Sequence, residues 1–197
     1  VYLDGVRELL ARVRDEHPGR PLFMLGHSMG GLIAAAFMRE SQSAFRGCIL
    51  SGPALMSDAA PHPIVLWVNR LISSLAPTVP MTGLDPAGLS RDPEVVRAYV
   101  SDRLVHHGKM SSRLIAELML AMRVTLAAAS EIEVPLLIMH GEADVLTSPS
   151  GSRECYTHAA SADKTLKLYP DLYHEIFNEP EKDKVLTDMT DWLEARL

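Results

Sequence analysis

The apolar and polar positions alternate between helix-like and strand-like stretches over most of the chain. Residues 2–16 carry apolar side chains every three or four positions with charged residues between them, which predicts an amphipathic helix. The short apolar run 22–25 predicts a strand, the pattern of 31–39 a helix, and residues 46–51 a second strand. Because strand, helix and strand in succession give a parallel pair, we expect a parallel sheet.

The stretch that follows has a different pattern. From residue 52 to about 130 we find no further strand pattern, only helical patterns interrupted by proline and glycine. An apolar stripe at helical spacing covers residues 64–75. Further helices are expected at 93–102, capped by Ser90 or Asp92, and at 111–129. An all-helical insertion of this kind is typical of a cap.

The strand and helix rhythm then resumes. Strands are expected at 134–139 and 165–169, and helices at 149–160 and from 181 to the end. We therefore predict an α/β fold whose core consists of residues 1–52 and 131–197, with residues 53–130 inserted as a helical cap.

Composition narrows the class of protein. The chain has 197 residues, 47% of them hydrophobic, enough for one domain with a sizeable core. Its net charge of −6 and the absence of a basic run argue against nucleic acid as a partner. Cys48 and Cys155 are too few for a disulfide framework, and we find neither a long apolar stretch nor a signal peptide. We therefore expect a cytoplasmic protein.

The segment Gly26-His27-Ser28-Met29-Gly30 lies between the first predicted strand and the next helix. This is the context of a G-x-S-x-G nucleophile elbow, in which the serine adopts a strained backbone conformation and projects from the sheet edge. Gly26 and Gly30 are expected to remove side chains that would collide there. A serine that only caps a helix would not need glycine on both sides, so Ser28 is the candidate nucleophile.

Two later loops offer the base and the acid that a serine nucleophile needs. Asp144 and His174 follow the strands expected at 134–139 and 165–169, and in this class of fold the acid follows the nucleophile and the histidine comes last. Glu142 and Asp171 are the alternatives to Asp144.

The remaining candidate residues give weaker evidence for a catalytic or metal-binding role. A metal cluster can be drawn from His140, Glu142, Asp144 and His174. Their spacing is not diagnostic of a metal site, so we expect neither metal nor cofactor. His27 is interpreted as a packed neighbour of the elbow. His106 and His107 are interpreted as surface or structural residues, with a place in a pocket left open for one of them.

Together these motifs resemble the monoacylglycerol lipase group of the serine α/β-hydrolases. The resemblance covers nearly the whole chain and rests on residues 26–31, 104–109, 140–144 and 173–180. It implies a catalytic triad of Ser28, Asp144 and His174, with the backbone N–H of Met29 as an oxyanion donor. It also implies a cap that forms an apolar tunnel for an acyl chain.

Part of the cap stripe is a candidate for substrate binding. Its members there are Ile64, Trp67, Val68 and Leu71. We expect them to line the mouth of the tunnel and to touch a lipid surface transiently. Plain packing within the cap is the alternative.

The chain also departs from the group. Arg103 stands where the group has proline before Leu104, and no strands or His-Gly loop precede the elbow strand in this sequence. We therefore expect an N-terminally truncated α/β-hydrolase fold that lacks the second oxyanion donor. Strand 22–25 would then be an exposed sheet edge, through which we predict self-association. The alternative is an opening helix, residues 2–16, folded across this edge.

The predicted function is that of a serine carboxylester hydrolase. The resemblance implies cleavage of monoacylglycerols to fatty acid and glycerol through an acyl-enzyme. A short-chain esterase or thioesterase would use the same three residues. A catalytically weak remnant that acts as a binding module is the third hypothesis, because the front of the sheet is absent from the sequence.

Overall fold

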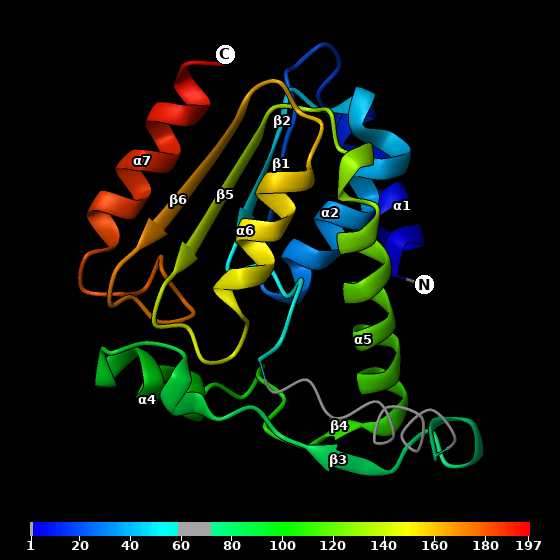
Figure 1. Ribbon diagram of the computed structural model, residues 1–197, viewed down its shortest axis with the longest axis vertical. Helices are drawn as coiled ribbons and strands as arrows, with labels where there is room; N and C mark the ends of the chain where they lie inside the picture. Colours follow the sequence, from blue (N-terminus) through cyan, green and yellow to red (C-terminus); the bar gives the residue numbers. More distant parts are fainter. Residues whose placement is uncertain (1, 59–71) are drawn as a thin grey trace.

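The computed structural model describes residues 2–58 and 72–197, which build a parallel sheet with helices on both faces (Figure 1). The sheet has the order β1-β2-β5-β6, and each neighbouring pair is parallel. Its strands are β1 (Phe23–His27), β2 (Gly47–Ser51), β5 (Leu136–Gly141) and β6 (Lys164–Tyr169). The predicted strands are all confirmed, with ends shifted by up to two residues.

Alternate side chains of the central strands enter two different cores. On β2, Cys48 and Leu50 join one core while Ile49 joins the other, and on β5 Leu136 and Leu137 are divided in the same way. All of these side chains are at most 1% exposed. Strands buried on both faces have continuous apolar sequences, which is why β2 and β5 appear as uninterrupted runs.

The helices divide between the two faces of the sheet. The first core is formed with α1 (Tyr2–Glu16), α2 (Met29–Ser41), α5 (Ser112–Ala127) and α6 (Pro149–His158). The second core is covered by α7 (Lys182–Glu194) through Val185 and Trp192. Short 3₁₀ turns lie at Gln42–Ala44, Pro86–Gly88 and Ala129–Glu131. The helices predicted at 2–16, 31–39, 111–129, 149–160 and from 181 onward are thus confirmed, whereas most of the stripe at 64–75 lies outside the described residues.

The segment between β2 and β5 is not entirely helical. It contains α4 (Pro93–Ser101), but also β3 (Pro80–Thr82) and β4 (Met110–Ser111), which pair in an antiparallel manner. The expectation of no strand in this segment is therefore wrong. Strands of two or three residues are too short to show an alternating pattern, and this pairing joins segments about 30 residues apart, so it has no local signal.

Residues 80–111 lie beyond the carboxyl ends of the sheet strands (Figure 1). The start of α4 is fixed there by Asp92, whose carboxylate accepts a hydrogen bond from Glu94 N–H at 2.8 Å, while Ser90 in turn accepts from Asp92 N–H at 3.0 Å. The N-cap of this helix is therefore Asp92, with Ser90 bracing it.

None of the helices described in the structure is long and apolar enough to cross a membrane.

Candidate active site

Ser28 occupies a strained turn between β1 and α2. Its backbone angles are φ 55° and ψ −120°, a left-handed conformation that non-glycine residues rarely adopt. Backbone hydrogen bonds hold it in place, because its N–H donates to Ser51 C=O at 3.0 Å and its C=O accepts from Ala54 N–H at 2.9 Å. The side chain makes no capping hydrogen bond to α2. The sequence-predicted elbow therefore forms, with a hydroxyl that its own helix does not engage.

The two glycines of the motif do different things. A Cβ on Gly26 would lie 2.3 Å from the carbonyl oxygen of Gly30, closer than any real contact. A Cβ on Gly30 would meet no described heavy atom within 4 Å. The expectation that both glycines relieve a side-chain collision is therefore wrong for Gly30, because it is the backbone of Gly30, rather than a side chain, that needs the space above Gly26.

Met29 begins α2 directly after Ser28. The first N–H groups of a helix have no acceptor within the helix and carry the positive end of its dipole. Met29 follows Ser28 directly in the chain, and its N–H belongs to the helix end that can bind an oxyanion.

His174 and Asp144 form a close buried pair. Nδ1 of His174 lies 2.7 Å from Oδ2 of Asp144, and the two residues are 2% and 5% exposed. The other oxygen, Oδ1, accepts backbone N–H groups from Leu146 at 2.8 Å and Thr147 at 3.0 Å. Burial by itself would raise the pKa of Asp144, but hydrogen bonds from His140 and His174 outweigh it and hold that pKa well below its ordinary value.

The elbow lies against the His174 ring. The ring of His27, next to Ser28 in the chain, has its centroid 4.7 Å from that of His174. Among the described residues no hydrogen bond joins the Ser28 hydroxyl to His174. Serine and base are often further apart before substrate binds. The structure thus brings Asp144 and His174 together and sets Ser28 in the elbow beside them.

His27 does not have the properties of a base. Burial, with a smaller contribution from the neighbouring His174, lowers the pKa of His27 to about 4. Its Nδ1 lies 3.1 Å from the hydroxyl of Ser51 on β2. A ring that stays neutral at pH 7 and is bonded within the fold fits the predicted role of a packed neighbour.

The alternative acids and histidines lie elsewhere. Glu142 pairs with Arg153 on the surface, and Asp171 is an exposed turn residue with φ 64°. His107 contacts the carbonyl of Asp102 at 3.1 Å and is exposed. No cluster of His, Cys, Asp and Glu suited to a metal ion occurs in the described part of the chain.

The contact of His140 with the candidate site was not predicted from the sequence, where His140 was considered only as a metal ligand. This side chain is completely buried, with Nε2 3.1 Å from Oδ2 of Asp144 and Nδ1 2.7 Å from the hydroxyl of Ser152. The spacing of four residues between His140 and Asp144, on either side of a strand end, was the signal that could have indicated the contact. Ser152, on α6, had no such signal.

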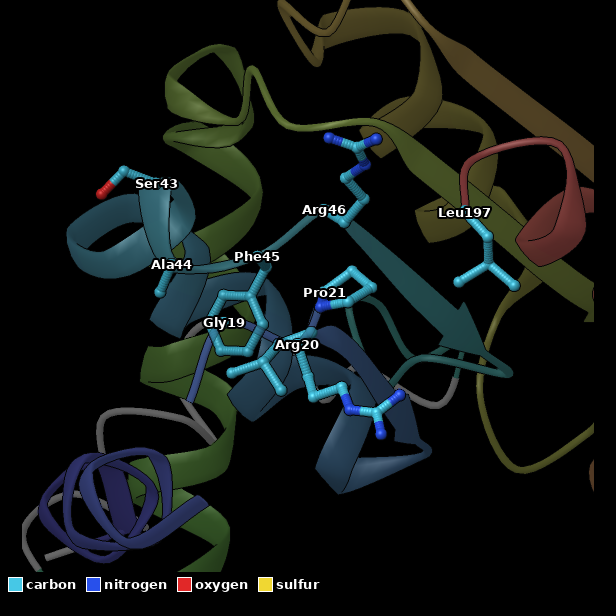
Figure 2. A pocket seen from close by; sticks show the side chains of 9 residues that line it. Gly19, Arg20, Pro21, Ser43, Ala44, Phe45, Arg46 and Leu197 are labelled. Atoms are coloured by element: carbon cyan, nitrogen blue, oxygen red, sulfur yellow. The ribbon is translucent and has the colours of Figure 1, made fainter. Parts of the chain in front are cut away.

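The candidate substrate residues Ile64, Trp67, Val68 and Leu71 lie outside the described residues. A pocket of about 500 Å³ is found elsewhere, between residues 19–22, residues 43–46 and Leu197 (Figure 2). It lies at the amino ends of β1 and β2, whereas the triad candidates follow carboxyl ends. Its Arg20 and Arg46 side chains extend in different directions, so they do not converge on a common ligand.

Comparison with known proteins supports a common architecture. Residues 1–181 match the family Hydrolase_4, described as serine aminopeptidase, S33. The chain is 39% identical over its whole length to a monoacylglycerol lipase of Mycolicibacterium smegmatis, of which it covers 70%.

Solved structures agree with this relationship. A monoacylglycerol lipase from Paleococcus ferrophilus superposes with a TM-score of 0.87 at 28% identity, over 99% of this chain and 76% of that one. A soluble variant of monoglyceride lipase from Saccharomyces cerevisiae, solved with a substrate analogue, gives 0.82 at 30% identity, over 98% and 67%. The expected α/β-hydrolase fold and the resemblance to monoacylglycerol lipases are thereby confirmed.

Proposed function

Since the chain belongs to the Hydrolase_4 family of serine hydrolases, we propose that it is a carboxylester hydrolase that cleaves monoacylglycerols to fatty acid and glycerol. The observation that carries the proposal is the strained Ser28 elbow beside the buried His174–Asp144 pair, in a chain similar over its full length to monoacylglycerol lipases. The lipid ester is the expected partner, and the proposed chemistry needs no metal or cofactor.

The proposed mechanism assigns one role to each residue. Asp144 binds Nδ1–H of His174, which leaves Nε2 free to take the proton of Ser28 as its oxygen attacks the ester carbonyl. The N–H of Met29 stabilises the oxyanion of the tetrahedral intermediate. Collapse of the intermediate releases glycerol, which takes the proton from His174, and leaves the acyl group on Ser28. Water deprotonated by His174 then attacks and releases the fatty acid.

Residues 53–130 are proposed to act as a cap over this site, on a core of residues 1–52 and 131–197. Exposed apolar side chains on the described part of the cap support contact with a lipid surface: Met81, Leu84, Val100 and Leu104, the last 95% exposed. The acyl chain is proposed to pass the stripe residues Ile64, Trp67, Val68 and Leu71.

We also propose a reducing compartment, the cytoplasm. Cys48 and Cys155 are free and buried, and burial raises the pKa of Cys155 to about 11 and that of Cys48 as well. Thiols in this state are inert and behave as small apolar side chains.

The function is tested with the purified chain, its Ser28→Ala variant and a series of esters of rising acyl length. We expect a fluorophosphonate probe to label Ser28 and long monoacylglycerols to be preferred. Ser28→Ala should abolish turnover, a loss of up to about 10⁶-fold, and leave the fold intact. A preference for acetyl or butyryl esters would instead identify a short-chain esterase. Labelling that survives Ser28→Ala would overturn the assignment, and a folded protein without labelling would indicate a binding module.

A further inference from the structure

His140 is a buried polar residue to which the mechanism above gives no role. It lies on β5, and its side chain has no exposure to solvent. Nε2 faces three oxygens: Oδ2 of Asp144 at 3.1 Å, the carbonyl of Thr147 at 3.3 Å and the hydroxyl of Thr147, also at 3.3 Å. Nδ1 lies 2.7 Å from the hydroxyl of Ser152, which is itself completely buried. Both ring nitrogens therefore have partners inside the protein.

These partners fix where the ring hydrogen lies. A carboxylate and a carbonyl only accept hydrogen bonds, and the Thr147 hydroxyl has closer acceptors for its own hydrogen, so Nε2 of His140 carries a hydrogen whatever the charge of the ring. In the neutral ring Nδ1 is then an acceptor, and the Ser152 hydroxyl donates to it. The acceptors at Nε2 thus select the tautomer that points an N–H at Asp144, and the Ser152 hydroxyl satisfies the nitrogen on the other side of the ring.

The Asp144 oxygen that receives this N–H is the one that binds His174. Oδ2 lies 2.7 Å from Nδ1 of His174 and also accepts from the Thr147 hydroxyl at 2.9 Å. That hydroxyl has a single hydrogen and a second acceptor, the carbonyl of Gly52 at 3.1 Å. Both additional donors to Oδ2 thus have a second acceptor, but the His140 ring is held at both nitrogens, whereas the hydroxyl can rotate.

We propose that His140 is a positioning residue of the hydrolytic reaction. Its N–H holds the Asp144 carboxylate in place against His174, and this hydrogen bond reduces the negative charge that the carboxylate presents to His174. The inference rests on the proposed roles of Asp144 and His174. His140 itself acts through Asp144 and does not touch the reacting atoms.

The two effects have separate consequences. Without its anchor the carboxylate can rotate away from His174, and misplacement of a catalytic group by about 1 Å costs on the order of 10²-fold in rate. While Oδ2 stays in contact with Nδ1, the loss of the His140 N–H leaves more negative charge on Oδ2, which then holds the His174 proton more tightly. The acidic limb of the pH profile of kcat/KM should then move to higher pH.

The test compares His140→Leu, His140→Gln and a control, His158→Gln. Leucine fills the site without a donor, while glutamine can place an amide N–H near the position of Nε2 and an oxygen toward Ser152. His158 is an exposed residue of α6 bonded to Glu154 C=O at 3.0 Å, so its replacement leaves the site untouched. Urea unfolding shows that each variant is folded.

On a soluble short ester, we expect His140→Leu to lower kcat by about 10- to 100-fold with little change in KM, and to shift the acidic limb upward. His140→Gln should have most of the parent kcat, with the acidic limb back near its parent position. His158→Gln should match the parent in both kcat and pH profile. A lower kcat with an unmoved limb in His140→Leu, and no rescue by glutamine, would overturn the proposal and indicate packing alone.

A second measurement does not depend on ester hydrolysis. The proton between His174 and Asp144 is expected to give a downfield ¹H resonance, which is assigned by its loss in His174→Ala. His140→Leu should shift this resonance, and His140→Gln should leave it near the parent position. An unshifted resonance in folded His140→Leu would overturn the positioning role even if the chain proved to have no esterase activity.

Discussion

At the scale of single residues, the site depends on backbone geometry and on a few buried hydrogen bonds. Ser28 stays at φ 55° because Ser51 of β2 binds its backbone N–H and Ala54, in the loop after β2, binds its C=O. Asp144 stays ionised because donors surround both of its oxygens. Each group is therefore prepared for its proposed role before a substrate arrives.

The elbow glycines give a prediction at this scale. Gly26→Ala should lower the free energy of unfolding by about 3 kcal/mol, the upper part of the range for overpacking, because the new Cβ meets the backbone of Gly30. Gly30→Ala is the matched control. It should keep or raise stability by up to about 1 kcal/mol, since alanine is favoured over glycine in a helix. Urea unfolding measures both, and an equal loss in the two variants would contradict the steric explanation.

At the scale of elements, the loop that carries His174 is tied to the start of α4. Glu179 of this loop is 1% exposed and accepts from Arg91 twice, from its N–H at 2.7 Å and from Nε at 2.5 Å. Arg91 also pairs with Glu181, and Glu175 N–H donates to Leu89 C=O at 2.8 Å. These contacts couple the segment over the sheet to the position of the proposed base.

Arg91→Ala should therefore be costly. It leaves a buried carboxylate without its cation, and the free energy of unfolding should fall by about 3 kcal/mol, the low end for a broken buried pair because Arg91 is partly exposed. Arg97→Ala, which removes an exposed pair with Glu94, should cost less than about 1 kcal/mol.

The double variant Arg91→Ala/Glu179→Gln separates charge from packing. It should recover part of the loss, because a neutral amide is cheaper to bury than an unpaired carboxylate. Chemical denaturation of the single and double variants measures this recovery, and no difference between them would contradict the role of the Glu179 charge.

At the scale of the whole molecule, the sheet has an edge at β1. Among the described strands β1 pairs with β2 alone, and Leu25 on β1 is 48% exposed. The helix α1 packs against the first core through Leu3, Val6 and Leu10 and leaves Leu9 60% exposed. An apolar edge of this kind tends to pair with another strand.

We propose that the 197-residue chain self-associates through this edge. Light scattering at micromolar concentration should show a dimer or a larger assembly that dissociates on dilution. Leu25→Lys should shift the balance to monomer, because a charge on the edge opposes strand addition. Leu9→Lys, on the exposed side of α1, is the control and should change little. A parent chain with a monomer mass at every concentration would show that the proposal is wrong.

Local pattern in the sequence was enough to predict much of this protein. Periodicity predicted the helices and the parallel strands, because their apolar faces repeat every few residues. The glycines around Ser28 predicted the elbow, since a sharp turn after a strand has a local signature. Chain order offered Asp144 and His174 as its partners, with Glu142 and Asp171 as alternatives.

The contacts between distant segments were decided by the tertiary structure. Strand β3 pairs with β4, and Arg91 binds Glu179, which lies 88 positions away in the chain. The fold also decides that Asp144, rather than Glu142 or Asp171, is the partner of His174. Ser152 meets His140 because α6 packs against β5, and Gly30 matters through its carbonyl. Such contacts leave no periodic trace, because they depend on which surfaces the packed elements bring together and on the few hydrogen-bond geometries that a buried polar group can satisfy.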